Sequence, residues 1–207
     1  MLQVKRVPVG PIQANCYVIY NENEALIVDP GADATLITNT LTGLGVKPIA
    51  VLLTHTHYDH IGALDEVSNH YGIPVYVGPE EASWLQDPSK NLSSLIGTSL
   101  VAEEADHLFN PTETLDISDF TFTVVPTPGH SPGSVSFIFE EDGFVITGDA
   151  LFAGSIGRTD FPGSSSATLL ESVRTELFSL PEEYTIYPGH MGASTIGREK
   201  KTNPFFN

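Results

Sequence analysis

Cysteine, basic residues and long apolar runs are all scarce in this chain of 207 residues. A single cysteine, Cys16, cannot form an internal disulfide, and the first residues contain no apolar run typical of a signal peptide. Nine basic residues stand against 26 acidic ones, and the resulting net charge of −17 repels nucleic acid and anionic lipid. No apolar stretch approaches the ~20 residues of a membrane-spanning helix. We therefore expect a soluble, cytoplasmic protein that binds neither nucleic acid nor membranes.

Short runs of β-branched and aromatic residues alternate with segments of helical periodicity. Helical spacing predicts helices over 33–44, 61–71 and 166–180, and the stretch 88–111 is compatible with either helix or loop. The predicted strands are 16–20, 25–31, 49–55, 74–78, 120–130, 134–149 with a hairpin turn at 140–143, and 184–190. This alternation indicates an α/β protein, and the length and 41% hydrophobic content favour one domain, residues 1–207.

The segment "THTHYDH" at 54–60 places three histidines and an aspartate within seven residues. Histidine nitrogen and carboxylate oxygen are common ligands for transition metals. The segment lies between a predicted strand and a predicted helix, so His55, His57 and Asp59 can project to one side of the loop while His60 turns to a neighbouring point. A lone histidine in a loop is usually solvated, but four such residues at this spacing predict a metal site.

Three more candidate ligands, His130, Asp149 and His190, each follow an apolar strand. Side chains at the carboxyl ends of strands converge above a sheet, where α/β enzymes build their sites. His70 and His107 do not follow predicted strands, and we expect them to be solvated or structural. Seven potential ligands exceed the three or four that one tetrahedral ion uses, which predicts two metal ions.

The segments "THTHYDH", "PGHSPGS", "TGDALF" and "YPGH" resemble, in order and spacing, the binding motifs of the metallo-β-lactamase fold superfamily. The resemblance covers nearly the whole chain and implies a four-layer αβ/βα sandwich. Within the superfamily, the chain is most similar to the glyoxalase II group, the hydroxyacylglutathione hydrolases. It is similar in particular to a short bacterial subtype that carries "GSIGRTDFPG".

The resemblance also implies a division of the ligands between two ions. His55, His57 and His130 would hold one metal, Asp59, His60 and His190 the second, and Asp149 would bridge the two. Zinc is expected, although the same nitrogen and oxygen donors also accept iron or manganese. The common zinc β-lactamases use a cysteine where this family has the bridging aspartate, and Cys16 lies too early in the chain to replace it. We therefore do not expect antibiotic hydrolysis.

The activity implied is hydrolysis of a thioester such as S-lactoylglutathione. Two divalent ions can share a water and lower its pKa towards neutrality, which supplies a hydroxide at pH 7. Asp59 is placed to orient this hydroxide as well as to bind metal. A thioester suits such a site because a thiolate departs readily and a strong general acid is not required.

Basic residues after Asp149 and His190 are the candidates for substrate recognition. Arg158, Arg198 and Lys200 could bind a carboxylate of the thiol carrier. Alternatively, Arg158 forms a structural pair with Asp160, and the lysines belong to a solvated tail. Long glyoxalase II enzymes grip glutathione with a C-terminal helical domain, whereas residues 191–207 are all that follow His190 here.

Two other functions remain open at this point. Persulfide dioxygenases resemble glyoxalase II, keep "GRTDF" and use one iron held by residues that match His55, His130 and Asp149. A non-catalytic metal-binding protein is the third alternative and ranks last, because every expected ligand is present. The sequence leaves the oligomeric state and the physiological thiol undetermined.

Overall fold

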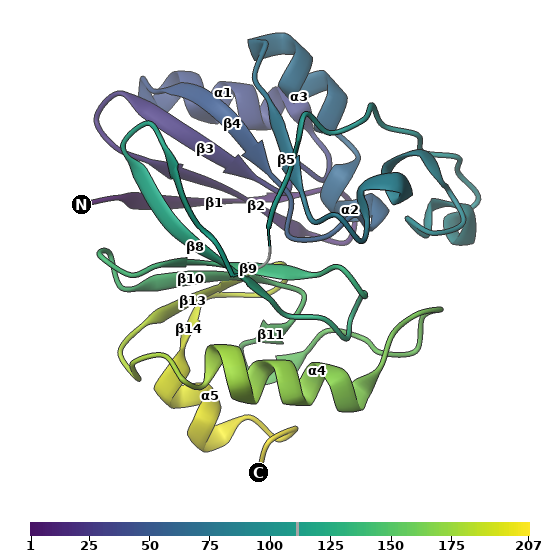
Figure 1. Ribbon diagram of the computed structural model, residues 1–207. Coiled ribbons are helices and arrows are strands. Elements are labelled where there is room, and N and C mark those ends of the chain that lie inside the picture. Colours follow the sequence, from purple (N-terminus) through teal and green to yellow (C-terminus); the bar gives the residue numbers. More distant parts are fainter. Residues whose placement is uncertain (111) are drawn as a thin grey trace. The chain divides into compact units, whose positions relative to one another are not determined.

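The computed structural model describes residues 1–110 and 112–207, which form two compact units, Met1–Leu108 and Phe109–Asn207 (Figure 1). Pro111, at the end of the stretch expected as helix or loop, lies outside the described residues. Each unit is built on a six-stranded sheet. The expectation of one domain over 1–207 is not tested by this division and stays a prediction.

The sheet of the first unit changes from antiparallel to parallel pairing along its strand order. Its first three strands pair antiparallel, and the others follow in parallel, so the carboxyl ends of neighbouring parallel strands meet at one edge. In order, the strands are β1 (Gln3–Val9), β2 (Ala14–Tyr20), β3 (Glu24–Val28), β4 (Lys47–Leu52), β5 (Val75–Val77) and β6 (His107–Leu108).

The helices of this unit cover one face of the sheet through their apolar stripes. Ile37 and Leu41 of the first long helix and Leu64 of the next belong to one buried cluster with strand residues such as Val18 and Ile27. Both of these helices lie above the strands in Figure 1. The helical segments are α1 (Ala34–Leu44), α2 (Tyr58–Ile61), α3 (Leu64–Tyr71) and the 3₁₀ turns η1 (Ala82–Gln86) and η2 (Ser93–Ile96).

The second unit also combines parallel and antiparallel pairs. The predicted hairpin turn at 140–143 is confirmed, because the amides of Asp142 and Gly143 both donate to the Phe139 carbonyl. The strands in order are β14 (Ser194–Thr195), β13 (Thr185–Pro188), β10 (Phe144–Gly148), β9 (Val135–Phe139), β8 (Phe120–Pro126) and β7 (Thr114–Ile117). A separate short hairpin consists of β11 (Leu151–Phe152) and β12 (Ser155–Ile156).

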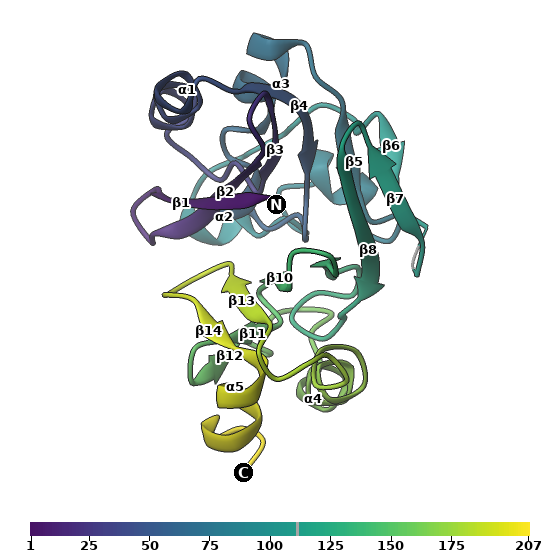
Figure 2. The ribbon, with the colours of Figure 1, turned by 90° about the vertical axis from the view of Figure 1, so that its left-hand side faces the viewer.

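The helical stretch 166–177 packs on one face of the second sheet and lies below β13 in Figure 2. Leu169, Val173 and Leu177, expected on one helix face, are buried in a cluster with Val145 and Ile186 of the strands. The predicted helix is α-helical in α4 (Ser166–Ser172) and then continues as a π-helical turn, η3 (Val173–Leu177). A further helix, α5 (Ile196–Thr202), follows β14. Among the described residues, no helix has the length and apolar content needed to cross a membrane.

A buried carboxylate fastens α5 to the rest of the second unit. Glu199 is fully buried and accepts hydrogen bonds from the Gly154 amide at 2.7 Å and the Asn203 side chain at 2.9 Å. The Ser194 hydroxyl donates a third. Because a buried carboxylate is costly without partners, this network accounts for a short, polar helix whose sequence has little apolar periodicity.

Candidate metal centre

The motif at 54–60 occupies the loop after β4 and the first turn of α2. His55 and His57 lie on the loop with their ring centroids 4.7 Å apart, and His60 brings its ring within 4.2 Å of His55. The Nε2 atom of His60 is 3.4 Å from a carboxylate oxygen of Asp59. All three imidazoles are buried, so the first unit brings its four predicted ligands together.

Asp29 is a buried residue of this cluster that the sequence reasoning did not single out. It directly follows β3, whose carboxyl end neighbours that of β4, and its oxygens accept hydrogen bonds from the Thr54 amide at 2.8 Å and the Thr54 hydroxyl at 2.6 Å. The same carboxylate accepts a hydrogen bond from Nδ1 of His60 at 2.9 Å. With its proton on Nδ1, His60 presents the lone pair of Nε2 on the side of Asp59.

The Thr54 hydroxyl also fixes the tautomer of His55. A hydroxyl has one proton, and that of Thr54 is donated to Asp29. Its oxygen, 3.1 Å from Nδ1 of His55, must therefore accept a hydrogen bond from Nδ1. His55 is thus held in the tautomer whose Nε2 lone pair can bind a metal, so one aspartate fixes two predicted ligands.

A second buried carboxylate, Glu81, holds the loop between His55 and His57. It is fully buried and accepts from the Thr56 amide at 2.9 Å and the Thr56 hydroxyl at 3.0 Å. Three residues further on, the Trp84 ring stacks on the His57 ring with a centroid separation of 6.5 Å. No local pattern in the sequence marks Glu81, because its partner lies 25 residues earlier.

Close packing of backbone against backbone also positions the motif. A side chain at Gly31 would overlap the carbonyl oxygen of Asp59, and one at Gly62 would overlap that of Gly31. These positions therefore require glycine so that the turn after β3 can approach α2. The strand predicted over 25–31 ends earlier, at Val28, because Asp29 has a φ of 52° and turns the chain.

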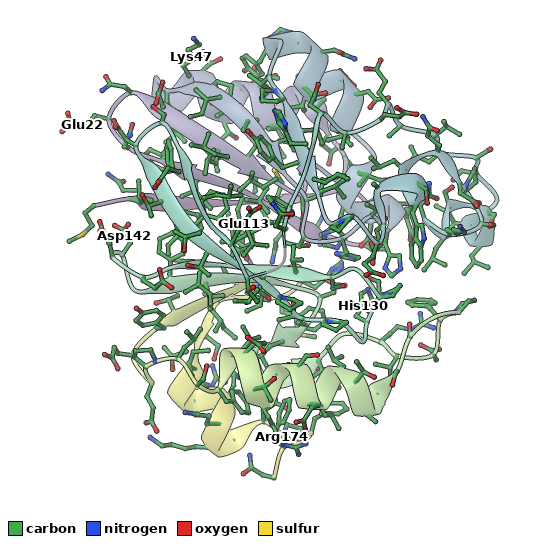
Figure 3. All side chains as sticks on the ribbon, viewed as in Figure 1. Glu22, Lys47, Glu113, His130, Asp142 and Arg174 are labelled. Atoms are coloured by element: carbon green, nitrogen blue, oxygen red, sulfur yellow. The ribbon has the colours of Figure 1, made fainter. Side chains whose placement is uncertain are left out.

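The second unit brings its own three predicted ligands together at one edge of its sheet. His130 follows β8, Asp149 follows β10 and His190 follows β13, which is parallel to β10. One oxygen of Asp149 lies 3.4 Å from Nε2 of His130 and 3.7 Å from Nε2 of His190. A carboxylate oxygen that two imidazole nitrogens approach in this way suits a ligand shared between two ions. His130 is labelled in Figure 3.

His130 is fixed by the loop that follows Asp149. Its Nδ1 donates to the Arg158 carbonyl at 2.7 Å, which leaves the Nε2 lone pair on the side of Asp149. The Ser164 hydroxyl donates to the backbone carbonyl of His130. A side chain at Gly157 would overlap the Asp149 carbonyl oxygen and would press against Nδ1 of His130. Glycine at this position therefore allows the loop to reach the imidazole.

The donors in each unit fit a divalent transition ion. Imidazole nitrogens, fixed by hydrogen bonds at His55, His60 and His130, together with the carboxylates of Asp59 and Asp149, are the ligand set that zinc, iron and manganese share. Ligand atoms of Asp29, His55 and His60 also lie within 4.8 Å of one another. The oxygens of Asp29 are occupied by Thr54 and His60, however, so Asp29 orients ligands and is not one itself.

The basic residues proposed to bind substrate have other surroundings. Arg158 forms a bidentate pair with Asp160, at 2.9 and 2.7 Å, and lies 4.4 Å from the centre of the Phe161 ring. Its guanidinium lowers the pKa of Asp160 below its usual range through this hydrogen bond. The predicted Arg158–Asp160 pair is present, and both side chains are about two-thirds exposed, at 67% and 65%.

Arg198 and Lys200 lie on α5, which begins beside the amino end of β13. The Ile196 amide donates to the carbonyl of Tyr184, directly before that strand, whereas His190 follows its carboxyl end. At ~3.3 Å per residue, the four residues of β13 separate these two ends by roughly 13 Å. The substrate roles of Arg198 and Lys200 stay predictions that this placement within the unit does not favour.

The remaining titratable residues have structural surroundings. His107 packs against Tyr76 with ring centroids 4.5 Å apart, and His70 against Tyr71 at 4.6 Å. Burial, and then the Asp29 carboxylate, raise the pKa of Cys16 far above its ordinary value, so the thiol is inert. Burial and the neighbouring Asp59 likewise raise the pKa of Tyr58, which is a neutral phenol at pH 7.

Comparison with known proteins places these residues in a family. A family model described as the metallo-beta-lactamase superfamily matches residues 9–190. A probable metallo-hydrolase of Bacillus subtilis (strain 168), YqgX, is 45% identical, and the match covers 98% of this chain and 97% of that protein. The hydroxyacylglutathione hydrolase GloC of Haemophilus influenzae is 36% identical, over 100% of this chain and 99% of its own.

Solved structures agree with the family match. The crystal structure of BLEG-1, described as a B3 metallo-beta-lactamase, is 46% identical with a TM-score of 0.96 and covers 99% of both chains. TTHA1623, solved in a di-iron-bound form, is 35% identical with a TM-score of 0.81, over 97% of this chain and 99% of that chain. The expected α/β metallo-β-lactamase fold is thereby confirmed, and metal-dependent hydrolysis is the general activity that follows. The chain belongs to the metallo-β-lactamase superfamily.

Proposed function

We propose that this protein is a thioester hydrolase that uses two divalent metal ions, with zinc as the expected metal. The observation that carries the proposal is the arrangement of the predicted ligands within each unit: hydrogen bonds fix the lone pairs of His55, His60 and His130, and Asp149 lies between two imidazoles. The similarity to GloC, described as a hydroxyacylglutathione hydrolase, supports a thioester as the substrate. The physiological partner would be a small thioester and neither nucleic acid nor a membrane.

The metal ligands in this proposal follow the family resemblance. His55, His57 and His130 would hold one ion, Asp59, His60 and His190 would hold the other, and Asp149 would contribute to both. When bound, such a pair of ions lowers the pKa of a water towards neutrality and polarises a carbonyl group. TTHA1623, a similar protein, is described in a di-iron-bound form, which supports a centre of two metal ions.

The chain's own residues supply orientation and charge. Asp29 and Thr54 keep the Nε2 lone pairs of His55 and His60 available before a metal binds. Asp59 and Asp149 add negative charge that offsets part of the charge of two cations. Asp59 also accepts a hydrogen bond from the attacking water and orients it towards the thioester carbonyl.

The reaction balances without a redox partner. The water oxygen forms the new C–O bond, the C–S bond breaks, and the carbon–sulfur electron pair leaves with the thiolate. The thiolate of a thiol with an ordinary pKa of ~8.5 departs without a strong general acid, and one proton from the water ends on the thiol or in solvent. The neutral phenol of Tyr58 adjoins Asp59 in sequence, but nothing in this scheme requires it to titrate.

Thiol release from S-lactoylglutathione by metal-replete protein under anaerobic conditions tests the proposal, together with metal analysis. We expect two metals per chain and steady turnover. The persulfide dioxygenase would replace this proposal if the protein bound one metal per chain, released no thiol and took up oxygen with glutathione persulfide.

Nitrocefin belongs in the same assay because BLEG-1 is described as a β-lactamase. The prediction that this chain does not hydrolyse antibiotics would be wrong if nitrocefin turned over faster than the thioester.

Asp59→Asn tests the role given to Asp59. The amide keeps the shape but removes the charge, so kcat should fall about 10²- to 10³-fold, ~3–4 kcal/mol, with a much smaller change in KM. Metal content measured on the same sample separates loss of an ion from loss of orientation. Asp65→Asn, in the same unit, is the matched control and should keep wild-type kcat. Equal losses in both variants would remove Asp59 from the catalytic scheme.

A further inference from the structure

An apolar cavity of about 240 Å³ lies within the first unit beside the predicted catalytic aspartate. We call it the hairpin pocket, because one wall is the turn between β1 and β2. The other wall is the end of η2 with the loop that follows it, and the floor includes the start of α2. Its principal lining residues are Pro11, Ile12, Tyr58, Asp59, Ile96 and Leu100.

The first wall is held in place by hydrogen bonds of its own turn. The Gln13 amide and side chain both donate to the Gly10 carbonyl, at 3.2 and 2.9 Å. The Gly10 amide donates in turn to the Asp33 carboxylate at 2.8 Å, which fixes the turn to the start of α1. Ile12 at its tip is 48% exposed, although nothing in the local backbone requires an apolar residue there.

The second wall is ordered by Asn91 and Ser93, both fully buried. The Asn91 side chain donates to the Leu100 carbonyl at 3.0 Å, and the Ser93 hydroxyl accepts from the Leu100 amide at 3.0 Å. The Asn91 carbonyl accepts from the Tyr58 amide at 2.8 Å, so this wall is joined directly to the turn that carries Asp59. The pocket is therefore preformed, and its position relative to the predicted catalytic residue Asp59 is fixed.

We propose that the hairpin pocket binds the aliphatic acyl chain of the thioester substrate. Ile96, on the second wall, is 53% exposed, and such exposed apolar residues facing one cavity are typical of a ligand site. The inference rests on the proposed function, because Asp59 places the thioester carbonyl at the pocket mouth. Carriers such as glutathione are polar and charged, so the acyl chain is the part of the substrate that this lining can desolvate.

The size of the cavity sets the class of acyl group. At ~30 Å³ for each water-sized group, 240 Å³ holds on the order of eight such groups, which corresponds to acyl chains of about four to eight carbons. Each methylene removed from water contributes about fourfold, the equivalent of roughly 0.8 kcal/mol. Because the pocket opens to solvent, we expect at least tenfold higher kcat/KM for hexanoyl than for acetyl thioesters, and the lactoyl group is shorter than the pocket permits.

A series of glutathione thioesters with acetyl, lactoyl, butanoyl, hexanoyl and octanoyl groups tests the proposal. Wild-type kcat/KM should rise from acetyl to hexanoyl, and Ile96→Asp should abolish that rise by placing a carboxylate in the lining. Leu95→Asp is the matched control, since Leu95 is the adjacent residue, is 65% exposed and does not line the pocket. It should keep the wild-type dependence on chain length. A flat series in the wild type, or equal loss in the two variants, would overturn the proposal.

Binding to metal-free protein separates the pocket from the chemistry. Calorimetry with S-hexylglutathione and S-methylglutathione, which cannot be hydrolysed, should show at least tenfold tighter binding of the hexyl compound to wild type and to Leu95→Asp. Ile96→Asp should bind both compounds equally. If no thioester releases thiol but the hexyl preference is present, the proposed function fails while the pocket assignment stands. Equal affinities in wild type, or a concentration-dependent dimer that Ile96→Asp dissociates, would instead show that these residues do not serve an acyl chain.

Discussion

Asp29→Asn tests whether Asp29 sets the tautomers of two predicted metal ligands, His55 and His60. Three donors face the Asp29 carboxylate: the Thr54 amide, the Thr54 hydroxyl and Nδ1 of His60. An asparagine has one acceptor oxygen and an amino group that donates, so it cannot accept from all three. His60 can then keep a hydrogen bond only by accepting at Nδ1, which moves its proton to Nε2 and blocks that atom for a metal.

The same substitution should reverse the tautomer of His55. Once the Thr54 hydroxyl no longer donates to residue 29, its proton can be donated to Nδ1 of His55, and the imidazole proton moves to Nε2. Loss of one such orienting contact typically lowers metal affinity 10- to 100-fold, ~1.4–2.7 kcal/mol. Because two ligands are affected, we expect a loss at or above 100-fold for Asp29→Asn.

The assay is competition for Zn²⁺ with a chromogenic chelator, with ¹⁵N NMR of the histidine rings in metal-free protein. Asp33→Asn is the control, since Asp33 also has a positive φ, 54° against 52° for Asp29, and asparagine tolerates that conformation equally. Asp33 contacts the Gly10 amide and no histidine in the observed hydrogen bonds. Wild-type zinc affinity in folded Asp29→Asn, or unchanged protonation of His55 and His60, would refute the idea that Asp29 sets the tautomers of these two histidines.

Three further predictions concern other parts of the chain. Asp149→Ala should lose bound metal together with activity, and full metal occupancy by elemental analysis would count against its predicted bridging role. Glu199→Ala removes the acceptor for the Gly154 amide, the Ser194 hydroxyl and one N–H of the Asn203 side chain, and should lower the free energy of unfolding in urea by roughly 3 kcal/mol, whereas Glu182→Ala, which removes an exposed pair with Lys201, should change it little. Cys16 should not react with a thiol reagent at pH 8 until the protein unfolds, because burial raises its pKa and keeps it protonated; rapid labelling of native protein would contradict this.

Apolar runs predicted most of the sheet strands, because a buried strand must be apolar whatever its neighbours are. Placing His130, Asp149 and His190 at strand ends was also sufficient to predict that these residues meet, and in the second unit they do. β1 was not predicted. It pairs with β2 at the edge of its sheet, contains Pro8 and has several exposed residues, so its sequence lacks a buried strand's pattern.

The residues that orient the predicted metal ligands were harder to predict than those ligands. Asp29 follows an apolar strand as Asp149 does, so the same rule could have found it. Glu81 could not be found in this way, because its contact with Thr56 depends on how the 3₁₀ turn η1 returns to the β4 loop. The described part of the stretch expected as helix or loop, 88–110, contains η2 and β6 but is otherwise irregular, and hydrogen bonds between Leu100 and the side chains of Asn91 and Ser93 order it.

In the proposed substrate recognition, charge contributes less binding energy than the apolar lining of the hairpin pocket. A net charge of −17 repels an anionic carrier such as glutathione, and the cations nearest in sequence to the ligands are occupied or distant: Arg158 is paired with Asp160, and Arg198 lies beside the amino end of β13. Long-range attraction therefore cannot supply much binding energy here. Desolvation of an acyl chain against Ile12 and Ile96 is independent of that charge. A chain built in this way would discriminate thioesters by the acid they release more than by the thiol that carries it.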